Sequence, residues 1–112
     1  MNQGDIYMAD LNPIRGREQA GVRPVLILQS SFLNQKLTTI VIIPLTSNLA
    51  YDGFLTTYLI SKKKSGLPRD SVALLHQIRT IETIRLIKRM GVLNRTEIEQ
   101  LKTKLSNIFY TA

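Results

Sequence analysis

Residues 38–45 read TTIVIIPL, and this run decides the fold. Nearly every residue in it is β-branched or apolar, which is typical of a β-strand buried on both faces. On either side of it, similar but shorter runs are separated by turn residues, and each predicts a further strand. These runs are GDIYMADL at 4–11, RPVLILQ at 23–29, FLTTYLIS at 54–61, SVALLHQI at 71–78 and KRMGVL at 88–93.

The end of the chain changes its period and predicts a helix. Asn94 is followed three residues later by Glu97, the pattern of a capping box. Apolar residues then recur at helical spacing, at Ile98, Leu101, Leu105 and Ile108. Many short strands closed by one helix favour a mainly β (α+β) fold, a curled antiparallel sheet or small barrel, over a parallel α/β fold, which needs helices between its strands.

Length and composition bound the class of protein. The 112 residues fit one domain and no composition break divides them, so we expect a single domain over residues 1–112. The sequence has neither a signal peptide pattern nor the roughly 20 apolar residues that cross a bilayer, so we expect a cytoplasmic protein. With no cysteine and one histidine, disulfides and thiolate zinc sites are excluded, and we expect no metal and no cofactor.

The charge of the chain is strongly basic. Fifteen Lys and Arg against eight Asp and Glu give a net charge of +7, which favours a polyanionic partner such as nucleic acid. The alternative is simple solvation, because net charge bears on association rather than on fold. Part of the charge lies in KKKSGLPRD at 62–70, which its glycine and proline predict to be an exposed loop.

Four short blocks point to function. They are Gly4-Asp5, PIRGREQAGVRP at 13–24, PLTS at 44–47 and DSVALLHQIRT at 70–80. In this order and at these separations they resemble the MazF/PemK toxins of the CcdB/Kid superfamily. Four ordered blocks over residues 4–80 make the resemblance far more specific than one short motif.

The resemblance implies a strongly bent, SH3-like antiparallel sheet with a C-terminal α-helix, assembled as a homodimer. It implies an mRNA interferase, the toxin of a type II toxin–antitoxin module, which cleaves single-stranded RNA at short sequences without a metal and so inhibits translation and growth. The products would be a 2′,3′-cyclic phosphate and a 5′-hydroxyl. The implied partners are RNA and an acidic, MazE-like antitoxin, with DNA contacted only through the antitoxin complex and no membrane contact.

On this resemblance Arg23 and Thr46 match the family's catalytic arginine and threonine, and Glu18 matches an acidic loop residue implicated in some members. In metal-free cleavage the 2′-hydroxyl attacks the adjacent phosphorus, so the site must move two protons and hold a phosphorane of increased charge. The guanidinium fork of Arg23 suits that charge. The hydroxyl of Thr46 both donates and accepts, so it suits a phosphate oxygen or the attacking group.

The proton acceptor is less clearly marked. Neither a guanidinium nor a neutral hydroxyl accepts a proton readily at neutral pH, so Glu18 is the first candidate. His76 is the alternative, because histidine is the side-chain type whose ordinary pKa lies near neutrality. Alternation along residues 71–78 nevertheless places His76 on the apolar face of its strand, which predicts a buried core residue. The family commonly has an acidic or other polar residue here, so His76 departs from its pattern.

Other residues are expected to contact RNA. They are Arg15, Arg17, Lys62, Lys63, Lys64, Gln77 and Arg79. The three lysines would bind phosphate and make affinity salt-dependent, or would form a solvated surface. Gln77 and Arg79 would reach RNA or the dimer partner, or have a structural role. Without the resemblance, Arg23 would be expected to form an ion pair and Thr46 to cap a turn. The resemblance favours the catalytic roles over these ordinary ones.

Two other functions compete on the sequence alone. A CcdB-like poison of DNA gyrase shares the fold without catalysis, but its contact is a Trp-Gly-Ile C-terminus, and this chain has no tryptophan and ends NIFYTA. A non-catalytic nucleic-acid-binding module would hold a single strand in a basic groove by aromatic stacking. Four tyrosines and three phenylalanines permit that function.

Overall fold

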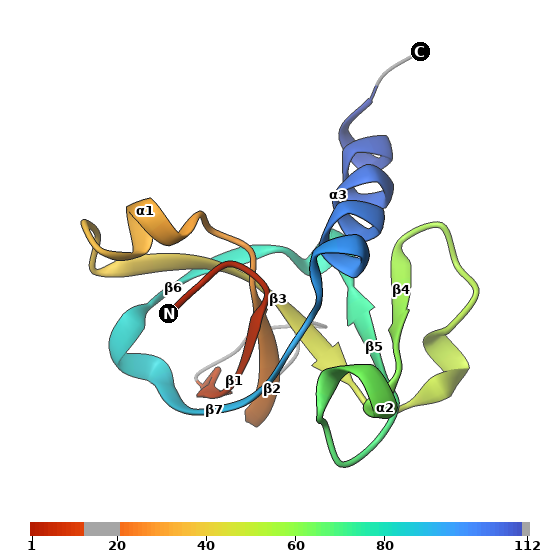
Figure 1. Ribbon diagram of the computed structural model, residues 1–112, viewed down its shortest axis with the longest axis horizontal. Coiled ribbons are helices and arrows are strands. Elements are labelled where there is room, and N and C mark those ends of the chain that lie inside the picture. Colours follow the sequence, from red (N-terminus) through yellow and green to blue (C-terminus); the bar gives the residue numbers. More distant parts are fainter. Residues whose placement is uncertain (13–20, 111–112) are drawn as a thin grey trace.

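The computed structural model describes residues 1–12 and 21–110. Its strands are β1 (Asp5–Asp10), β2 (Val22–Ile27), β3 (Thr39–Thr46), β4 (Thr57–Ile60), β5 (Ser71–Leu74), β6 (Arg79–Glu82) and β7 (Leu86–Val92). Its helices are α1 (Ser31–Asn34), α2 (Lys62–Ser65) and α3 (Arg95–Phe109), with the 3₁₀ turns η1 (Leu49–Tyr51), η2 (Leu75–Gln77) and η3 (Thr83–Arg85). In this described part, seven strands form an antiparallel sheet followed by α3 (Figure 1), which confirms the predicted mainly β fold with a C-terminal helix.

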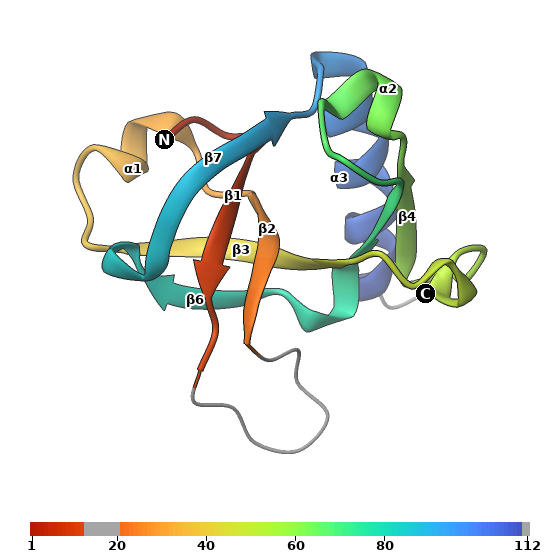
Figure 2. The same ribbon diagram turned by 90° about the horizontal axis from the view of Figure 1, so that it is seen from below.

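The sheet is organised around β3. Along one edge, β3 pairs with β2 from Ile42 to Pro44. Along the other edge it pairs first with β6 and then, through Leu45 and Thr46, with β5. Because one strand serves two partners in succession, the sheet bends around it. Figure 2 shows β3 running through the molecule from the end that carries α1 to the end that carries α2 and β4. The outer strands β4 and β7 do not pair with each other within the described residues, so the sheet is curled but not closed.

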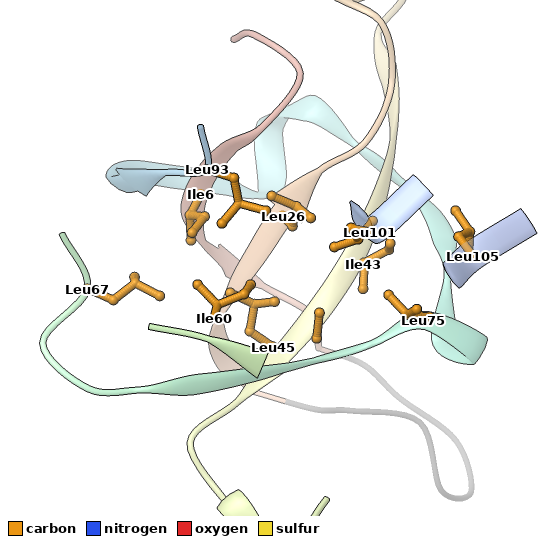
Figure 3. Packing of buried hydrophobic residues seen from close by; sticks show 11 residues of the cluster. Ile6, Leu26, Ile43, Leu45, Ile60, Leu67, Leu75, Leu93, Leu101 and Leu105 are labelled. Carbon is orange, nitrogen blue, oxygen red and sulfur yellow. The ribbon is translucent and has the colours of Figure 1, made fainter. Parts of the chain in front are cut away.

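Both faces of β3 are buried, as its composition predicts. Ile43 and Leu45 belong to the cluster that α3 covers, whereas Ile42 belongs to a cluster on the opposite face. In Figure 3 the first cluster extends from Leu67 at one end to Leu105 of α3 at the other. Removal of these apolar side chains from water on both faces is the main force that fixes the sheet.

Helix α3 begins as the sequence predicts. The Asn94 side chain accepts a hydrogen bond from the Glu97 N–H at 2.8 Å, and the Glu97 carboxylate accepts one from the Asn94 N–H at 3.2 Å. This reciprocal pair satisfies N–H groups that the helix itself leaves without acceptors. Leu101 and Leu105 are buried against the sheet, so the predicted apolar face is confirmed.

Strand β4 is tied to α3 by a tyrosine. The Tyr58 hydroxyl donates a hydrogen bond to Oε1 of Gln100 at 2.8 Å. Burial raises the pKa of the Tyr58 phenol, and the negative charge of Glu97 raises it further. The phenol therefore stays protonated at neutral pH and keeps its donor role.

Two predicted strands have different bounds. The strand expected over 54–61 begins only at Thr57, because the Thr57 hydroxyl closes a turn by accepting from the Phe54 N–H at 3.2 Å. The strand expected over 71–78 ends at Leu74, and the chain turns through η2 into β6, which the sequence did not predict. The turn is needed because β5 and β6 pair with different parts of the same edge of β3.

This turn also overturns the prediction that His76 is a buried core residue. Side chains alternate between faces only while the backbone stays extended, and His76 lies in the middle of a 3₁₀ turn. Its side chain is exposed.

The segment predicted to be an exposed loop is partly buried. Lys62, Lys63 and Lys64 are exposed on α2, but Leu67 lies in the core with 5% of its surface exposed. The carbonyl of Ser65 lies so close to Gly91 of β7 that a Cβ at Gly91 would overlap with it. The lysines are thus presented by a backbone that packs directly against the sheet.

This close approach gives a test of the packing. Gly91→Ala is expected to lower the free energy of unfolding by about 1–3 kcal/mol, because the added methyl must displace the Ser65 backbone. Urea unfolding followed by circular dichroism measures the change. Lys88→Ala, at an exposed position of the same strand, serves as the control and should change stability by less than about 0.5 kcal/mol. Equal stability of the two variants would contradict the tight contact.

Candidate active site

Arg23 and Thr46 lie near the ends of two neighbouring strands. Arg23 is half-buried in β2, opposite Ala9 of β1. Thr46 is the last residue of β3, opposite Val72 of β5, and only 8% of its surface is exposed. Its hydroxyl accepts a hydrogen bond from the Asn48 N–H at 3.2 Å, which fixes the side chain and leaves the hydroxyl proton available to another acceptor.

The register of β2 and β3 relates the two side chains. Val25 is opposite Pro44, and antiparallel partners step in opposite directions, so the same register continued by two residues sets Arg23 opposite Thr46. Residues that are opposite each other project from the same face of a sheet. The ladder itself ends at Val25 and Pro44, so Arg23 and Thr46 flank the point where the two strands separate.

A second arginine projects from the same face. Arg79 of β6 is opposite Ile42, and Ile42 shares a face with Thr46 because the two are four residues apart on one strand. Gln77 ends the turn just before it. His76, Gln77, Ile78 and Arg79 together line a pocket of about 350 Å³. This face therefore carries two guanidinium groups and a hydroxyl, and the amide of Gln77 and the exposed imidazole of His76 lie in the pocket that Arg79 lines.

Another pocket, of about 310 Å³, opens on the opposite face of the same strand ends. Its polar lining residues are Arg23, Ser47, Arg69 and Ser71. Its apolar lining residues are Met8, Val22, Pro24, Leu45, Leu67, Pro68 and Met90. Arg23 thus lines this pocket, although its register places it on the face that carries Thr46.

The sequence did not single out Arg69 or Ser71 as site residues. The one sign of Arg69 was its place in the basic segment after α2, and the one sign of Ser71 was its place in the DSVALLHQIRT block. Their approach to β1, β2 and β7 depends on the packing of that segment against Gly91, which no local pattern encodes.

Arg85 is another residue that the sequence did not mark. Its guanidinium donates to the carbonyl oxygens of Asp10 and Asn12. The Asn12 side chain in turn accepts from the Gly21 N–H at 3.1 Å, and the Gly21 carbonyl accepts from the Leu11 N–H at 3.0 Å. These contacts hold the end of β1 and the start of β2 together, close to Arg23.

The remaining predicted site residues fall into two groups. Glu18, Arg15 and Arg17 lie outside the described residues. Lys62–Lys64 are exposed on α2, and the residues that follow them line the pocket that Arg23 shares. Arg23 and the segment that follows the lysines are therefore neighbours.

Neither a metal cluster nor a membrane helix is found in residues 1–12 and 21–110. No group of three or more His, Cys, Asp or Glu side chains there could hold a metal ion. No helix in these ranges is long and apolar enough to cross a membrane.

The candidate site is suited to charge stabilisation at a phosphate. Guanidinium groups are planar, permanently charged and able to donate two parallel hydrogen bonds to phosphate oxygens. Arg23 and Arg79 are half-buried, and such positions reduce screening of a charge by water.

Comparison with known proteins gives consistent results. The family described as PemK-like, MazF-like toxin of type II toxin–antitoxin system matches residues 2–109. The endoribonuclease MazF of Staphylococcus epidermidis is 37% identical over 105 residues, which cover 94% of this chain and 88% of that protein.

Solved structures show the same fold. The Mycobacterium tuberculosis toxin MazF-mt6 superposes with a TM-score of 0.78 at 26% identity, with 94% of this chain and 95% of that chain covered. MazF in a MazE–MazF complex from Deinococcus radiodurans gives a TM-score of 0.78 at 19% identity, with 100% of this chain and 97% of that chain covered.

Proposed function

The chain belongs to the family of PemK-like, MazF-like toxins of type II toxin–antitoxin systems, and we propose that it is an endoribonuclease in which Arg23 and Thr46 hold the phosphate that is cleaved. The observation that carries the assignment of these two residues is the register that sets them on one face where β2 and β3 separate. The similarity to an endoribonuclease favours this function over a gyrase poison or a non-catalytic binding module.

The proposed reaction needs no metal. The 2′-oxygen attacks the adjacent phosphorus while its proton passes to a base, and the bond from phosphorus to the 5′-oxygen breaks as that oxygen takes up a proton. The products are a 2′,3′-cyclic phosphate and a 5′-hydroxyl. Arg23 would stabilise the added charge of the phosphorane, and the Thr46 hydroxyl would donate to one of its oxygens.

Two groups compete for the role of proton acceptor. Glu18 is the acceptor that we propose, and it lies outside the described residues. The alternative is His76, whose side chain is exposed beside Gln77 in the pocket that ends at Arg79. Glu18→Gln and His76→Asn separate the two, because only loss of the true acceptor should abolish the acidic limb of the pH–rate profile, where the rate falls as the acceptor takes up a proton.

The activity is tested with purified protein and single-stranded RNA in excess EDTA. We expect cleavage to continue in the chelator. The product that begins at the cleaved bond should have a 5′-hydroxyl, which kinase labels directly. The product that ends there should carry the cyclic phosphate on its 3′ end. RNA that stays intact in every buffer would contradict the enzyme. Cleavage that stops in EDTA would contradict the metal-free mechanism.

We also propose that the partner is an acidic antitoxin. A chain with a net charge of +7 attracts an acidic segment, and a disordered segment of this kind would fold as it covers the surface that RNA uses. Antitoxin and RNA should therefore compete, and we expect the active toxin to be a homodimer.

The lysines of α2 give a test of the path that RNA takes. Changing Lys62, Lys63 and Lys64 to Gln together should lower the slope of log affinity against log salt by about 2, since each phosphate contact on a single strand contributes about 0.7. Fluorescence anisotropy with 2′-O-methyl RNA, which cannot be cleaved, measures this slope.

The matched control removes three cations from α3. These are Arg95, Lys102 and Lys104, which lie on the helix that covers the sheet. The control should leave the salt dependence nearly unchanged. If both triple variants lower it equally, the α2 lysines act only through net charge.

A further inference from the structure

We propose that the pocket beneath Arg23 binds the base of a nucleotide next to the cleaved phosphate, and that Arg69 reads the edge of that base. This inference rests on the proposed endoribonuclease function and extends it to a residue that determines specificity. The pocket has a volume of about 310 Å³ and lies on the face of β2 and β3 opposite to Thr46. It meets the proposed reaction site at Arg23, which lines it.

The lining has the two components that an unstacked base requires. Met8, Pro24, Leu67 and Met90 supply apolar walls on which a flat ring can pack. Ser47, Arg69 and Ser71 supply polar groups to the lining. Splayed bases of single-stranded RNA are recognised in this way, by apolar packing of the ring and hydrogen bonds to its edge.

The size of the pocket limits its occupant. At about 310 Å³ it lies at the lower end of the range for small-ligand sites, roughly 300–1,000 Å³, so it holds one ring system rather than a stretch of chain. An apolar side chain of a protein partner would also fit the walls. It would leave the polar groups of Ser47, Arg69 and Ser71 without partners, so the lining favours a nucleotide.

Arg69 is the polar group best placed to read the base. Its side chain is exposed, and the structure shows no ion pair between it and another described residue. A guanidinium only donates, so it selects a base that turns acceptor atoms toward it. Ser71 is nearly buried, and its hydroxyl donates to the Arg69 carbonyl at 3.3 Å, which leaves its lone pairs to accept from an amino group.

The methionines allow the pocket to be observed directly. Met8 and Met90 line it, whereas Met1 lies at the exposed N-terminus and serves as an internal control. With ¹³C-methyl methionine, the chain is titrated with an oligonucleotide of the cleaved sequence that carries 2′-deoxyribose 5′ of the scissile bond. We expect the Met8 and Met90 methyl signals to shift and the Met1 signal to stay. Binding by anisotropy without those shifts would overturn the proposal.

The same titration distinguishes a protein ligand. If an acidic antitoxin peptide shifts the Met8 and Met90 signals and RNA does not, the pocket binds a peptide and the proposal is overturned. Wild-type protein that cleaves no RNA would contradict the proposed function itself, whereas cleavage without the methyl shifts contradicts only this inference.

Arg69→Ala tests the role in specificity. Sequencing the 5′ ends of cleaved RNA should show preference at one position relaxed by about 10- to 100-fold, the range expected when a good base contact is lost. Arg69→Lys keeps the charge without the fork and should also relax it. Arg95→Ala, which removes an equal charge from α3, should leave the cleavage profile unchanged. A uniform fall in cleavage at all sequences for Arg69→Ala would overturn the assignment, because it would indicate general electrostatic attraction.

Discussion

Replacing Arg23 with alanine should lower kcat/KM for RNA cleavage by about 100-fold or more while the protein stays folded. The proposed role of the guanidinium is to meet charge that appears only as the phosphorane forms, so its loss acts on the transition state more than on bound RNA. Single-turnover cleavage gives the rate, and anisotropy with 2′-O-methyl RNA gives the affinity. The dissociation constant should rise much less than the rate falls.

Two controls define this result. Arg95→Ala removes the same charge from α3 and should cleave like the wild type. Arg23→Lys keeps a positive charge but loses the two-pronged donor, so only part of the activity should return. If Arg23→Ala weakens binding and cleavage by the same factor, the residue is a binding contact and the catalytic assignment is wrong.

Part of the fold follows from local sequence. Residues 38–45 predict β3 to within one residue at each end, because a continuous β-branched run has few alternatives to a strand buried on both faces. Asn94 and Glu97 mark the start of α3 because the capping box is a purely local interaction. These elements were predictable since their stabilising contacts lie close together in the chain.

Other parts depend on contacts that a local pattern does not contain. SVALLHQI reads as one strand, yet it breaks after Leu74 because β5 and β6 must pair with separate parts of β3. The break moves His76 from the predicted core to the surface. Periodicity failed here because tertiary pairing, rather than propensity, sets where the strand ends.

The candidate site shows the same division. The motifs named Arg23 and Thr46, but that they share a face follows only from the register between β2 and β3. The grouping of Arg69 with Met8 and Met90 comes from a segment distant in the chain, which Gly91 allows to pack closely. A motif identifies residue types, whereas the shape of a pocket is set by long-range packing.

Thr46→Val should lower the cleavage rate by about 10- to 100-fold with little change in stability. Valine matches the shape of threonine but removes the hydroxyl that we propose as a donor to the phosphorane, and a neutral donor contributes less than the charge of Arg23. The lost acceptor for the Asn48 N–H should cost about 1 kcal/mol or less, because Asn48 is exposed and water can replace it. Single-turnover cleavage and urea unfolding measure the two effects.

Thr46→Ser and Thr39→Val separate catalysis from strand structure. Serine keeps the hydroxyl and should retain most of the activity, although it loses a methyl group from a buried position. Thr39 is the exposed first residue of the same strand. Its change to valine removes the same hydroxyl group from β3, but at the end of the strand away from the proposed site of the phosphate. Cleavage should therefore be unaffected. If Thr46→Val cleaves as well as Thr39→Val, the hydroxyl only closes the turn to Asn48, and Arg23 must act with a different partner.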